Sequence, residues 1–444
     1  MKISIAGAGA GKTTKMADKI IESHEKLAEH LNIYCIAFTN NAAEHIANKL
    51  ANHFGEIPKR IKVSTIHSFL YQEIIRPYYF LLYGKQYEKI SHIKLPEDVR
   101  TKNWKLSQLD KNNIIHIDNF SQRALWVMVK KSSDRKAEKD LRKVVQREFA
   151  RYCGAIFVDE AQDIDDNVLE IIKQFDSLGI VLELMGDPKQ DLKGFGNLRR
   201  LVDVVSQGVD YITECHRCPQ AHLDISNRLV AASERQHSCR GIEGSLSVIY
   251  ENDVDVEKLI MGEMYDLKYI SAKNERYETH RISESSNKFD TLYYELMDVV
   301  ERMFSGRSRI AIERTAFFWT NKLLKIYDQE HNAGKAMRAV FDGDNRLTSK
   351  DYARIVQSVQ QSEVGKGGIP VSSIESIKGR EGNNCLFILT TDLAEYLFGK
   401  KKADNKTKNK LYVALTRSLE RLTILITEEV EEKHGRDNIE DYFK

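Results

Sequence analysis

Apolar residues in the first half of the chain gather in short runs of strand length, and segments with the apolar spacing of helices follow them. The strands predicted from these runs are Lys2–Ala6, Asn32–Phe38, Arg60–Thr65, Ala155–Val158 and Ile180–Met185. Strands that alternate with helices form parallel sheets covered on both faces. This half of the chain is therefore predicted to be an α/β domain.

A long segment with helical periodicity, about 71–151, separates the third predicted strand from the fourth. We interpret 75–145 as a helical insertion in a first domain, 1–205. A second series begins near Val209 and predicts a second α/β domain, 206–444, with a reduced insertion at the polar stretch 233–304. Its strand candidates are Ile310–Phe318, Val371–Ile374, Cys385–Thr390 and Leu422–Thr427.

Composition narrows the class of protein. Of 444 residues, 42% are hydrophobic and 30% charged, and no apolar run approaches the roughly 18 residues of a membrane helix. The first residues lack the basic start and long apolar core of a secretory signal, so we expect a cytoplasmic protein without membrane contact. A net charge of +2 means that any track for nucleic acid must be local. The basic stretch 130–151 fits such a track or a solvated helix face.

Six cysteines are scattered along the chain and do not form the pattern of a disulfide framework. Cys215 and Cys218 form one CxxC motif. Such a pair is read either as part of a zinc site or as two ordinary buried thiols.

A glycine-rich loop between the first predicted strand and helix is the clearest candidate for chemistry. Phosphates are held by converging backbone N–H groups, which requires a loop almost free of side chains, and the following helix N-terminus favours anions. Lys12 is placed to reach the β- and γ-phosphates of ATP, and the Thr13 hydroxyl to bind Mg²⁺. The predicted nucleotide-binding residues here are Ala6, Gly7, Ala8, Gly9, Ala10, Gly11, Lys12, Thr13 and Thr14.

Two adjacent acids follow the buried strand 155–158, at the end of a strand where open α/β sheets bind ligands. Asp159 is predicted to hold Mg²⁺, and Glu160 to polarise the attacking water as general base.

Together with other motifs, these two resemble the superfamily-1 helicases of the UvrD, Rep and PcrA type. Similar motifs occur in the family's order along nearly the whole chain. They are Phe38–Ala43, Ser64–Phe69, Asp159–Asp163, Gly186–Gln190, Glu214–Cys218, Ser376–Gly382 and Leu411–Arg417. The resemblance implies two RecA-like domains and an ATP-dependent DNA helicase or single-stranded DNA translocase that moves 3′ to 5′.

The same resemblance assigns roles to single residues. It implies that Gln190 senses the γ-phosphate, that Arg217 and Arg417 act as arginine fingers, and that Glu381 contacts the nucleotide. For DNA it implies base stacking on aromatic rings and contacts to the backbone. The residues concerned are Phe38, Thr39, Asn40, Thr65, His67 and Phe195.

The chain departs from the family pattern at several places. Met1–Ile5 holds no counterpart of the glutamine that reads adenine, which leaves the choice of base open. Lys193 and Gly196 stand where the family has an aromatic residue and an arginine, and Glu375 replaces a histidine.

The compact size suggests a partner. Small helicase-like chains of this sort accompany a nuclease, as in the Gabija phage-defence pair, and we hypothesise such a nuclease partner and an antiviral role. The alternative reading is a DNA-sensing ATPase that regulates the nuclease. A P-loop kinase is disfavoured because it would not need Thr65–Phe69 or Leu411–Arg417.

Overall fold

The computed structural model describes residues 1–96, 98–205, 208–272, 276–279, 285–304, 306–341, 347–360 and 369–443. The chain forms two compact units. The first, here called the core unit, consists of Met1–Gln86, Asn119–His280 and Gly368–Lys444. The second, the helical unit, consists of Tyr87–Asp118 and Arg281–Gly367.

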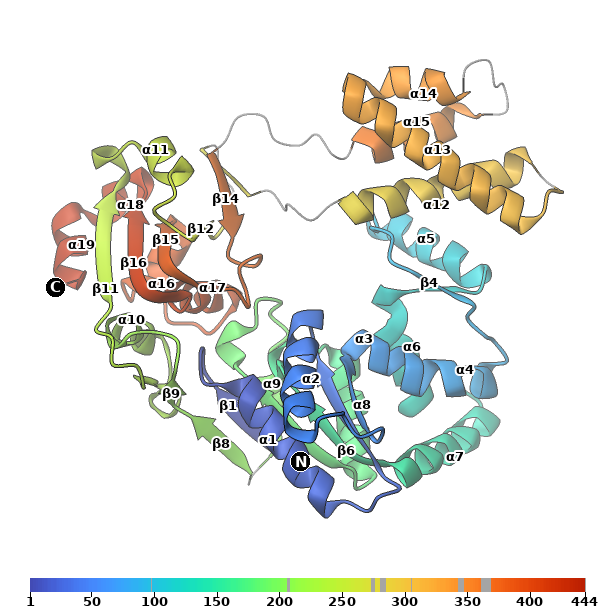
Figure 1. Cartoon of the computed structure of the whole chain (residues 1–444), viewed down its shortest axis with the longest axis horizontal. Coiled ribbons are helices and arrows are strands. Elements are labelled where there is room, and N and C mark those ends of the chain that lie inside the picture. Colours follow the sequence, from blue (N-terminus) through green and yellow to red (C-terminus); the bar gives the residue numbers. More distant parts are fainter. Residues whose placement is uncertain are drawn as a thin grey trace. The chain divides into compact units, whose positions relative to one another are not determined.

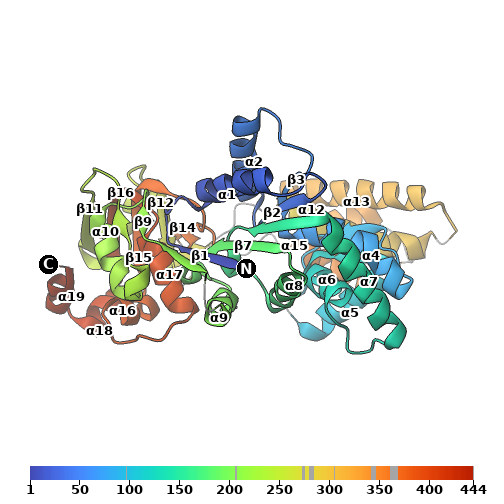
Figure 2. The ribbon, with the colours of Figure 1, turned by 90° about the horizontal axis from the view of Figure 1, so that it is seen from below.

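The first sheet of the core unit is entirely parallel. Its strand order is β3-β2-β6-β7-β1-β8, with bounds Ile61–Thr65, Asn32–Ala37, Cys153–Val158, Val181–Gly186, Lys2–Ala6 and Val209–Ile212. Figure 2 shows α1 (Lys12–Lys26) and α2 (Asn40–Phe54) on one face of this sheet, and α8 (Asp166–Ser177) and α9 (Asn197–Val204) on the other. The first series of predicted strands is therefore confirmed. The segment near Val209 differs from its prediction, because β8 pairs with β1 in the first sheet.

The second sheet is also parallel. Its strand order is β11-β16-β15-β12-β14-β13, with bounds Ser245–Tyr250, Ser418–Ile426, Gly382–Leu389, Leu267–Ile270, Ile369–Ser373 and Tyr277–Thr279. Around it lie α10 (Gln220–Ser226), α11 (Val256–Met261), α16 (Thr391–Leu397), α17 (Lys406–Leu415), α18 (Glu428–His434) and α19 (Arg436–Phe443) (Figure 1). The predicted α/β class with two parallel sheets is confirmed. The predicted insertion at 233–304 contains β11 and β12, two strands of this sheet.

One predicted strand of the second series is wrong. Ile310–Phe318 lies inside α13 (Arg309–Glu330), a long helix. Its β-branched and aromatic residues imitate a buried strand, but they divide between two sides of the helix. Ile312 and Ala316 are buried, whereas Ile310, Phe317 and Phe318 are exposed.

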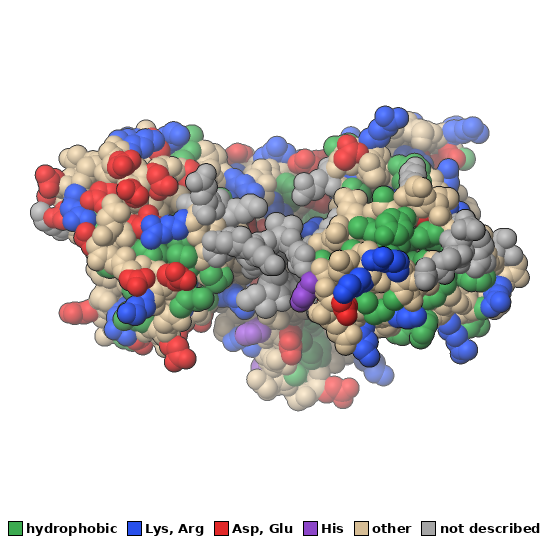
Figure 3. All heavy atoms as spheres, turned by 90° about the horizontal axis from the view of Figure 1, so that it is seen from above, with side chains coloured by type: hydrophobic (Ala, Val, Ile, Leu, Met, Phe, Trp, Pro, Cys, Tyr) green, Lys and Arg blue, Asp and Glu red, His purple; other side chains and the backbone are tan. Residues whose placement is uncertain are grey.

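The helical unit combines two segments that are far apart in sequence. The first contributes β4 (Lys89–Ser91), α5 (Val99–Lys111) and β5 (Ile114–His116). The second contributes α12 (Ser285–Met303), α13, α14 (Ala333–Phe341) and α15 (Ser349–Gln360), which share a core that includes Leu296, Leu323 and Ile355. Figure 3 shows hydrophobic side chains among lysines and arginines on one face of this unit.

The remaining part of the predicted first insertion belongs to the core unit. It contains α4 (Arg76–Tyr83), α6 (Phe120–Met128) and the start of α7 (Lys136–Tyr152), and η1 (Leu70–Ile75) leads into it. Within the described ranges, no helix is both long and apolar enough to cross a membrane.

Candidate nucleotide site

The glycine-rich loop joins β1 to α1, as predicted. Gly9 and Gly11 have φ angles of 68° and 71°, a left-handed conformation that residues with a side chain rarely adopt. Thr13 and Thr14 follow Lys12 in the first turn of α1. The Lys12 ammonium donates to the carbonyls of Ala6 and Gly7, at 3.4 Å each. The lysine therefore lies over its own loop, where a phosphate would meet it.

Residues that come later in the chain cover this loop closely. A methyl group on Gly7 would lie 2.2 Å from the Gln236 side chain, and one on Gly9 would lie 2.4 Å from Cβ of Arg217. The backbone N–H of His216 also donates to the carbonyl of Gly9 at 2.8 Å. Glycine is thus required here by the close approach of the second half of the core unit as well as by backbone conformation.

Three of the covering side chains surround the peptide groups of Ala8. The Ala8 N–H donates to the Tyr412 hydroxyl at 3.2 Å, and this hydroxyl donates to Gln236 at 2.9 Å. The Ala8 carbonyl accepts from Gln236 at 3.0 Å and from the Cys215 thiol at 3.1 Å. Neither Gln236 nor Tyr412 was predicted as a site residue, and Cys215 was considered only as a zinc ligand or a buried thiol. Cys215 and Tyr412 lie inside recognised motifs, whereas no local signal marks Gln236.

The two predicted acids follow β6 and lie in the same site. Glu160 has a φ of 54°, an unusual conformation for a residue with a side chain, and strain of this kind often marks functional sites. Burial and the neighbouring Glu160 raise the pKa of Asp159 to about 7, although Lys12 acts against them. Burial opposes ionisation of Glu160 too, but Lys12 and Lys378 lower its pKa. A buried carboxyl of this kind fits a divalent cation, whose charge would keep Asp159 ionised.

A chain of hydrogen bonds connects Gln190 to Glu160. Gln190 donates to the Asp187 carboxylate at 2.9 Å, and the backbone N–H of Asp187 donates to the Gln162 side chain at 2.9 Å. Gln162 in turn donates to Glu160. Beside this chain, the buried Lys189 pairs with Asp187 at 2.7 Å and with Glu234 at 2.8 Å. The glutamine in the predicted sensing position is therefore linked to the predicted general base.

The two predicted arginine fingers lie near each other. Arg217 donates to Glu381 at 2.6 Å, so the predicted nucleotide contact Glu381 is an arginine partner in this structure. Arg417 is only 1% exposed and donates to the carbonyls of Val413 and Arg380. Burial and the charge of Arg217 lower the pKa of Arg417 to about 10.

The predicted DNA-stacking residues Phe38 and Phe195 are half-buried and share one neighbour. The Lys193 ammonium lies 5.9 Å from the centre of the Phe38 ring and 5.7 Å from that of Phe195. The residue that departs from the family pattern thus contacts both rings. A lysine near two aromatic rings is suited to binding single-stranded DNA, because the rings can stack on bases and the ammonium can contact phosphates.

The other predicted DNA contacts hold local structure. Thr39 caps α2 by accepting from the N–H of Ala42 at 3.2 Å, and Asn40 is the first residue of that helix. Thr65 caps the short helix α3 (Ile66–Phe69). His67 is exposed beside the ring of Phe120, with 6.1 Å between ring centres. Thr39 and Thr65 follow or end the paired strands β2 and β3, so they lie at one edge of the sheet.

The cysteines and Glu375 also have defined surroundings in the structure. All six cysteines are free, and among the described residues no group of three or more His, Cys, Asp or Glu side chains could hold a metal. Cys215 and Cys218 are two buried thiols in this structure. Glu375, which replaces a histidine of the family, pairs with Lys410 at 2.7 Å.

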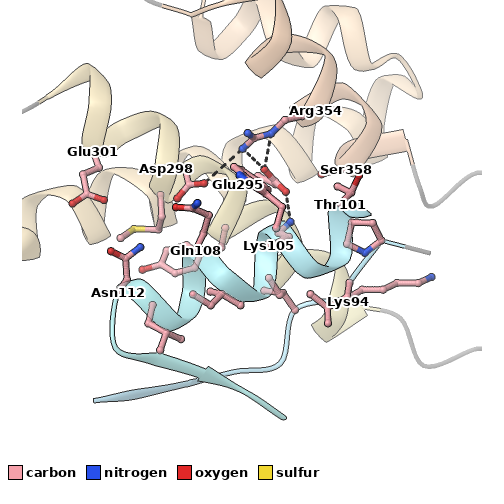
Figure 4. Close-up of a pocket in the computed structure, with 18 of the residues that line it drawn as sticks. Lys94, Thr101, Lys105, Gln108, Asn112, Glu295, Asp298, Glu301, Arg354 and Ser358 are labelled. Atoms are coloured by element: carbon pink, nitrogen blue, oxygen red, sulfur yellow. Dashed lines mark hydrogen bonds and ion pairs between the residues drawn. The ribbon is translucent and has the colours of Figure 1, made fainter. Parts of the chain in front are cut away.

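A separate pocket of about 1020 Å³ lies within the helical unit, between α5 and the helices α12 and α15 (Figure 4). Glu295 lies at its wall and forms ion pairs with Lys105 and with Arg354. Asp298 lies 3.7 Å from the same arginine. This network joins the two segments that build the unit.

A parallel sheet with a glycine-rich loop, an acidic pair at a strand end and two arginines from later in the chain are the arrangement expected of P-loop NTPases with RecA-like domains. Residues 1–196 match the protein family described as AAA domain. The chain is also similar to the Gabija protein GajB of Bacillus cereus (strain VD045), with 30% identity over 196 residues. This similarity covers 42% of the chain and 36% of that relative, about a third of its length. The resemblance to UvrD-like helicases is thereby confirmed over this part of the chain.

Proposed function

We propose that this chain is an ATP-dependent motor of the UvrD-like type that moves 3′ to 5′ along single-stranded DNA. The main support is the contact between the phosphate loop and Arg217. The Cβ of Arg217 lies so close to Gly9 that no side chain would fit there. A phosphate-binding loop on one half and arginines on the other form a site that is complete only when the halves meet.

Each residue of the site then has a chemical role. Mg²⁺ would be held by Thr13 and Asp159, and it would supply charge neutralisation at the phosphate oxygens. Lys12, Arg217 and Arg417 add positive charge where negative charge develops in the transition state. Glu160 orients the attacking water and accepts its proton.

Coupling to DNA follows from the position of Gln190. Its hydrogen bonds reach Glu160 through Asp187 and Gln162, and Lys193, which contacts Phe38 and Phe195, follows it in the chain. Loss of the γ-phosphate could therefore alter the position of Gln190 and, through the same loop, of Lys193 and the aromatic rings on which bases would stack.

The similarity to a Gabija protein favours a role in phage defence with a nuclease partner. It also supports a second candidate, a DNA-sensing ATPase that regulates that nuclease. Displacement of a labelled strand from a duplex with a 3′ single-stranded tail distinguishes the two. A motor displaces the strand in an ATP-dependent manner, whereas a sensor hydrolyses ATP without displacement.

The first test is steady-state ATP hydrolysis with and without single-stranded DNA. Lys12→Ala should lower the rate by about 100-fold or more, because a charge is lost from the transition state. Lys26→Ala serves as the control, since Lys26 lies at the exposed end of the same helix and pairs with Glu22. Hydrolysis that survives Lys12→Ala, or that DNA does not stimulate in the wild type, would overturn the proposed motor.

A further inference from the structure

Cys215 and Cys218 bracket His216 and Arg217 in the segment that covers the phosphate loop. Both thiols are fully buried. The Cys215 sulfur donates to the carbonyl of Ala8 at 3.1 Å and accepts from the backbone N–H of Cys218 at 3.3 Å. A pair of thiols thus lies against the nucleotide site, with a predicted arginine finger between them in the sequence.

The two thiols have opposite electrostatic surroundings. A hydrogen bond from Cys218, helped by backbone N–H groups and by Arg217, lowers the pKa of Cys215 to about 6 although burial opposes it. The same hydrogen bond and burial raise the pKa of Cys218. An uneven pair of this kind contains one sulfur suited to attack and a second suited to resolve the product.

We propose that Cys215 and Cys218 are a reversible modification site, which a peroxide oxidises to a disulfide when the phosphate loop moves away from Cys215. The thiolate of Cys215 attacks one peroxide oxygen, the O–O bond breaks, and the released hydroxide takes up a proton to become water. The Cys218 sulfur then attacks the sulfur of the resulting sulfenic acid, and its thiol proton leaves with the second oxygen as water. The two sulfurs together lose two electrons, which reduce one hydrogen peroxide to two waters.

The disulfide would change the nucleotide site directly. It changes the sulfur that lies 3.1 Å from the carbonyl of Ala8, and it closes a covalent ring around the backbone of Arg217. A nucleotide site that depends on an arginine finger tolerates little displacement of that arginine. ATP hydrolysis should therefore fall when the disulfide forms. This consequence rests on the proposed function, whereas formation of the disulfide does not.

The contact with Ala8 also makes the reaction dependent on the state of the site. Both sulfurs are buried, and the phosphate loop lies against that of Cys215. A non-hydrolysable ATP analogue that keeps the halves together should therefore slow oxidation. Cys239, which is exposed and whose N–H donates to the carbonyl of Cys215 at 2.8 Å, provides the matched control.

The test treats the full-length protein with hydrogen peroxide and follows intact mass, peptide linkage and ATP hydrolysis. Wild type and Cys239→Ser should each lose the mass of two hydrogens, with Cys215 linked to Cys218 in the digest. Cys218→Ser should instead form a sulfenic acid at Cys215 that dimedone traps. Hydrolysis should fall about tenfold on oxidation and return with dithiothreitol.

Two outcomes would overturn the proposal. One is a protein in which both thiols are still alkylated by iodoacetamide after peroxide treatment and denaturation. The other is a disulfide that involves Cys239 in place of either thiol. A disulfide that forms as expected in a protein without ATP hydrolysis would refute the proposed function and leave the modification site standing.

Discussion

The Lys378 ammonium lies 2.8 Å and 2.7 Å from the two carboxylate oxygens of Asp163. Lys378 precedes β15 of the second sheet, and Asp163 follows the acidic pair at the end of β6 in the first. The ion pair therefore joins the two halves of the core unit beside the predicted catalytic acids. Burial raises the pKa of Asp163, and Lys378 opposes that change.

A double-mutant cycle with Lys378→Gln and Asp163→Asn should give a coupling energy of about 1–2 kcal/mol in urea unfolding, because both side chains are largely shielded from water. The exposed pair Arg200 and Asp166, at 3.0 Å, is the control and should give less than about 0.5 kcal/mol. Equal coupling in the two pairs would show that Lys378 does not hold the halves together.

Replacement of Arg417 is predicted to lower ATP hydrolysis without lowering the stability of the fold. Arg417 is buried, and its hydrogen bonds go to neutral oxygens, namely the carbonyls of Val413 and Arg380 and the hydroxyl of Thr416. A buried charge without an anionic partner is costly. Arg417→Met should therefore leave the free energy of unfolding unchanged or raise it by about 1 kcal/mol, while ATP hydrolysis falls by about 100-fold.

The measurement combines denaturant unfolding with the hydrolysis assay. Arg421→Met is the control, since Arg421 is exposed on β16 and donates to Asn384. It should retain hydrolysis. A strongly destabilised Arg417→Met protein would instead assign this arginine a structural role.

The two sheets were predictable to different extents for physical reasons. In the first half each strand is a short apolar run, such as the fully buried Cys153–Val158, which ends directly at a motif. In the second half, Ile310–Phe318 has strand-like residues in a helix, and Leu267–Ile270 is a strand inside a polar stretch. Local pattern does not reveal which segment pairs with which when the connections are long.

Much of the candidate site could also be read from the sequence, because its glycines, acids and arginines lie in motifs with fixed spacing. Gln236 could not, since its contact with Ala8 joins residues far apart in the chain. The same holds for Glu295, which meets Lys105 from a distant segment. Such contacts depend on tertiary packing, which leaves no periodic signal.

The Phe195 ring and the Lys193 charge should make separate contributions to the binding of single-stranded DNA. Phe195→Ala should weaken binding of a labelled oligothymidine by about 1–3 kcal/mol, through lost stacking. Lys193→Ala should lower the salt dependence of binding by about 0.7 in the slope of log K against log salt. Fluorescence anisotropy at several salt concentrations measures both. Phe80→Ala, at an exposed phenylalanine of α4, should change neither quantity.

Glu295 is predicted to stabilise the helical unit. Although burial acts against ionisation, Lys105 and Arg354 lower the pKa of Glu295. A lowered folded-state pKa contributes stability above the unfolded pKa, and this contribution is lost as the pH falls through the folded value. Glu295→Gln should cost about 1–3 kcal/mol at neutral pH and much less in acid. Glu170→Gln, in an exposed pair with Lys173, should cost little at either pH in the same unfolding experiment.

We predict that Tyr412 competes with phosphate for the loop. Its hydroxyl occupies the N–H of Ala8, one of the backbone donors that a phosphate-binding loop offers its ligand. Tyr412→Phe removes this acceptor and leaves Gln236 without its donor, which weakens the contact that occupies the Ala8 N–H. Nucleotide binding, followed by titration of a fluorescent ATP analogue, should therefore become about three- to fivefold tighter, equivalent to roughly 0.5–1 kcal/mol for one hydrogen bond. Tyr396→Phe, whose hydroxyl meets Asn405 away from the loop, should bind as the wild type does. Weaker binding by Tyr412→Phe would mean that the hydroxyl prepares the loop for phosphate rather than blocking it.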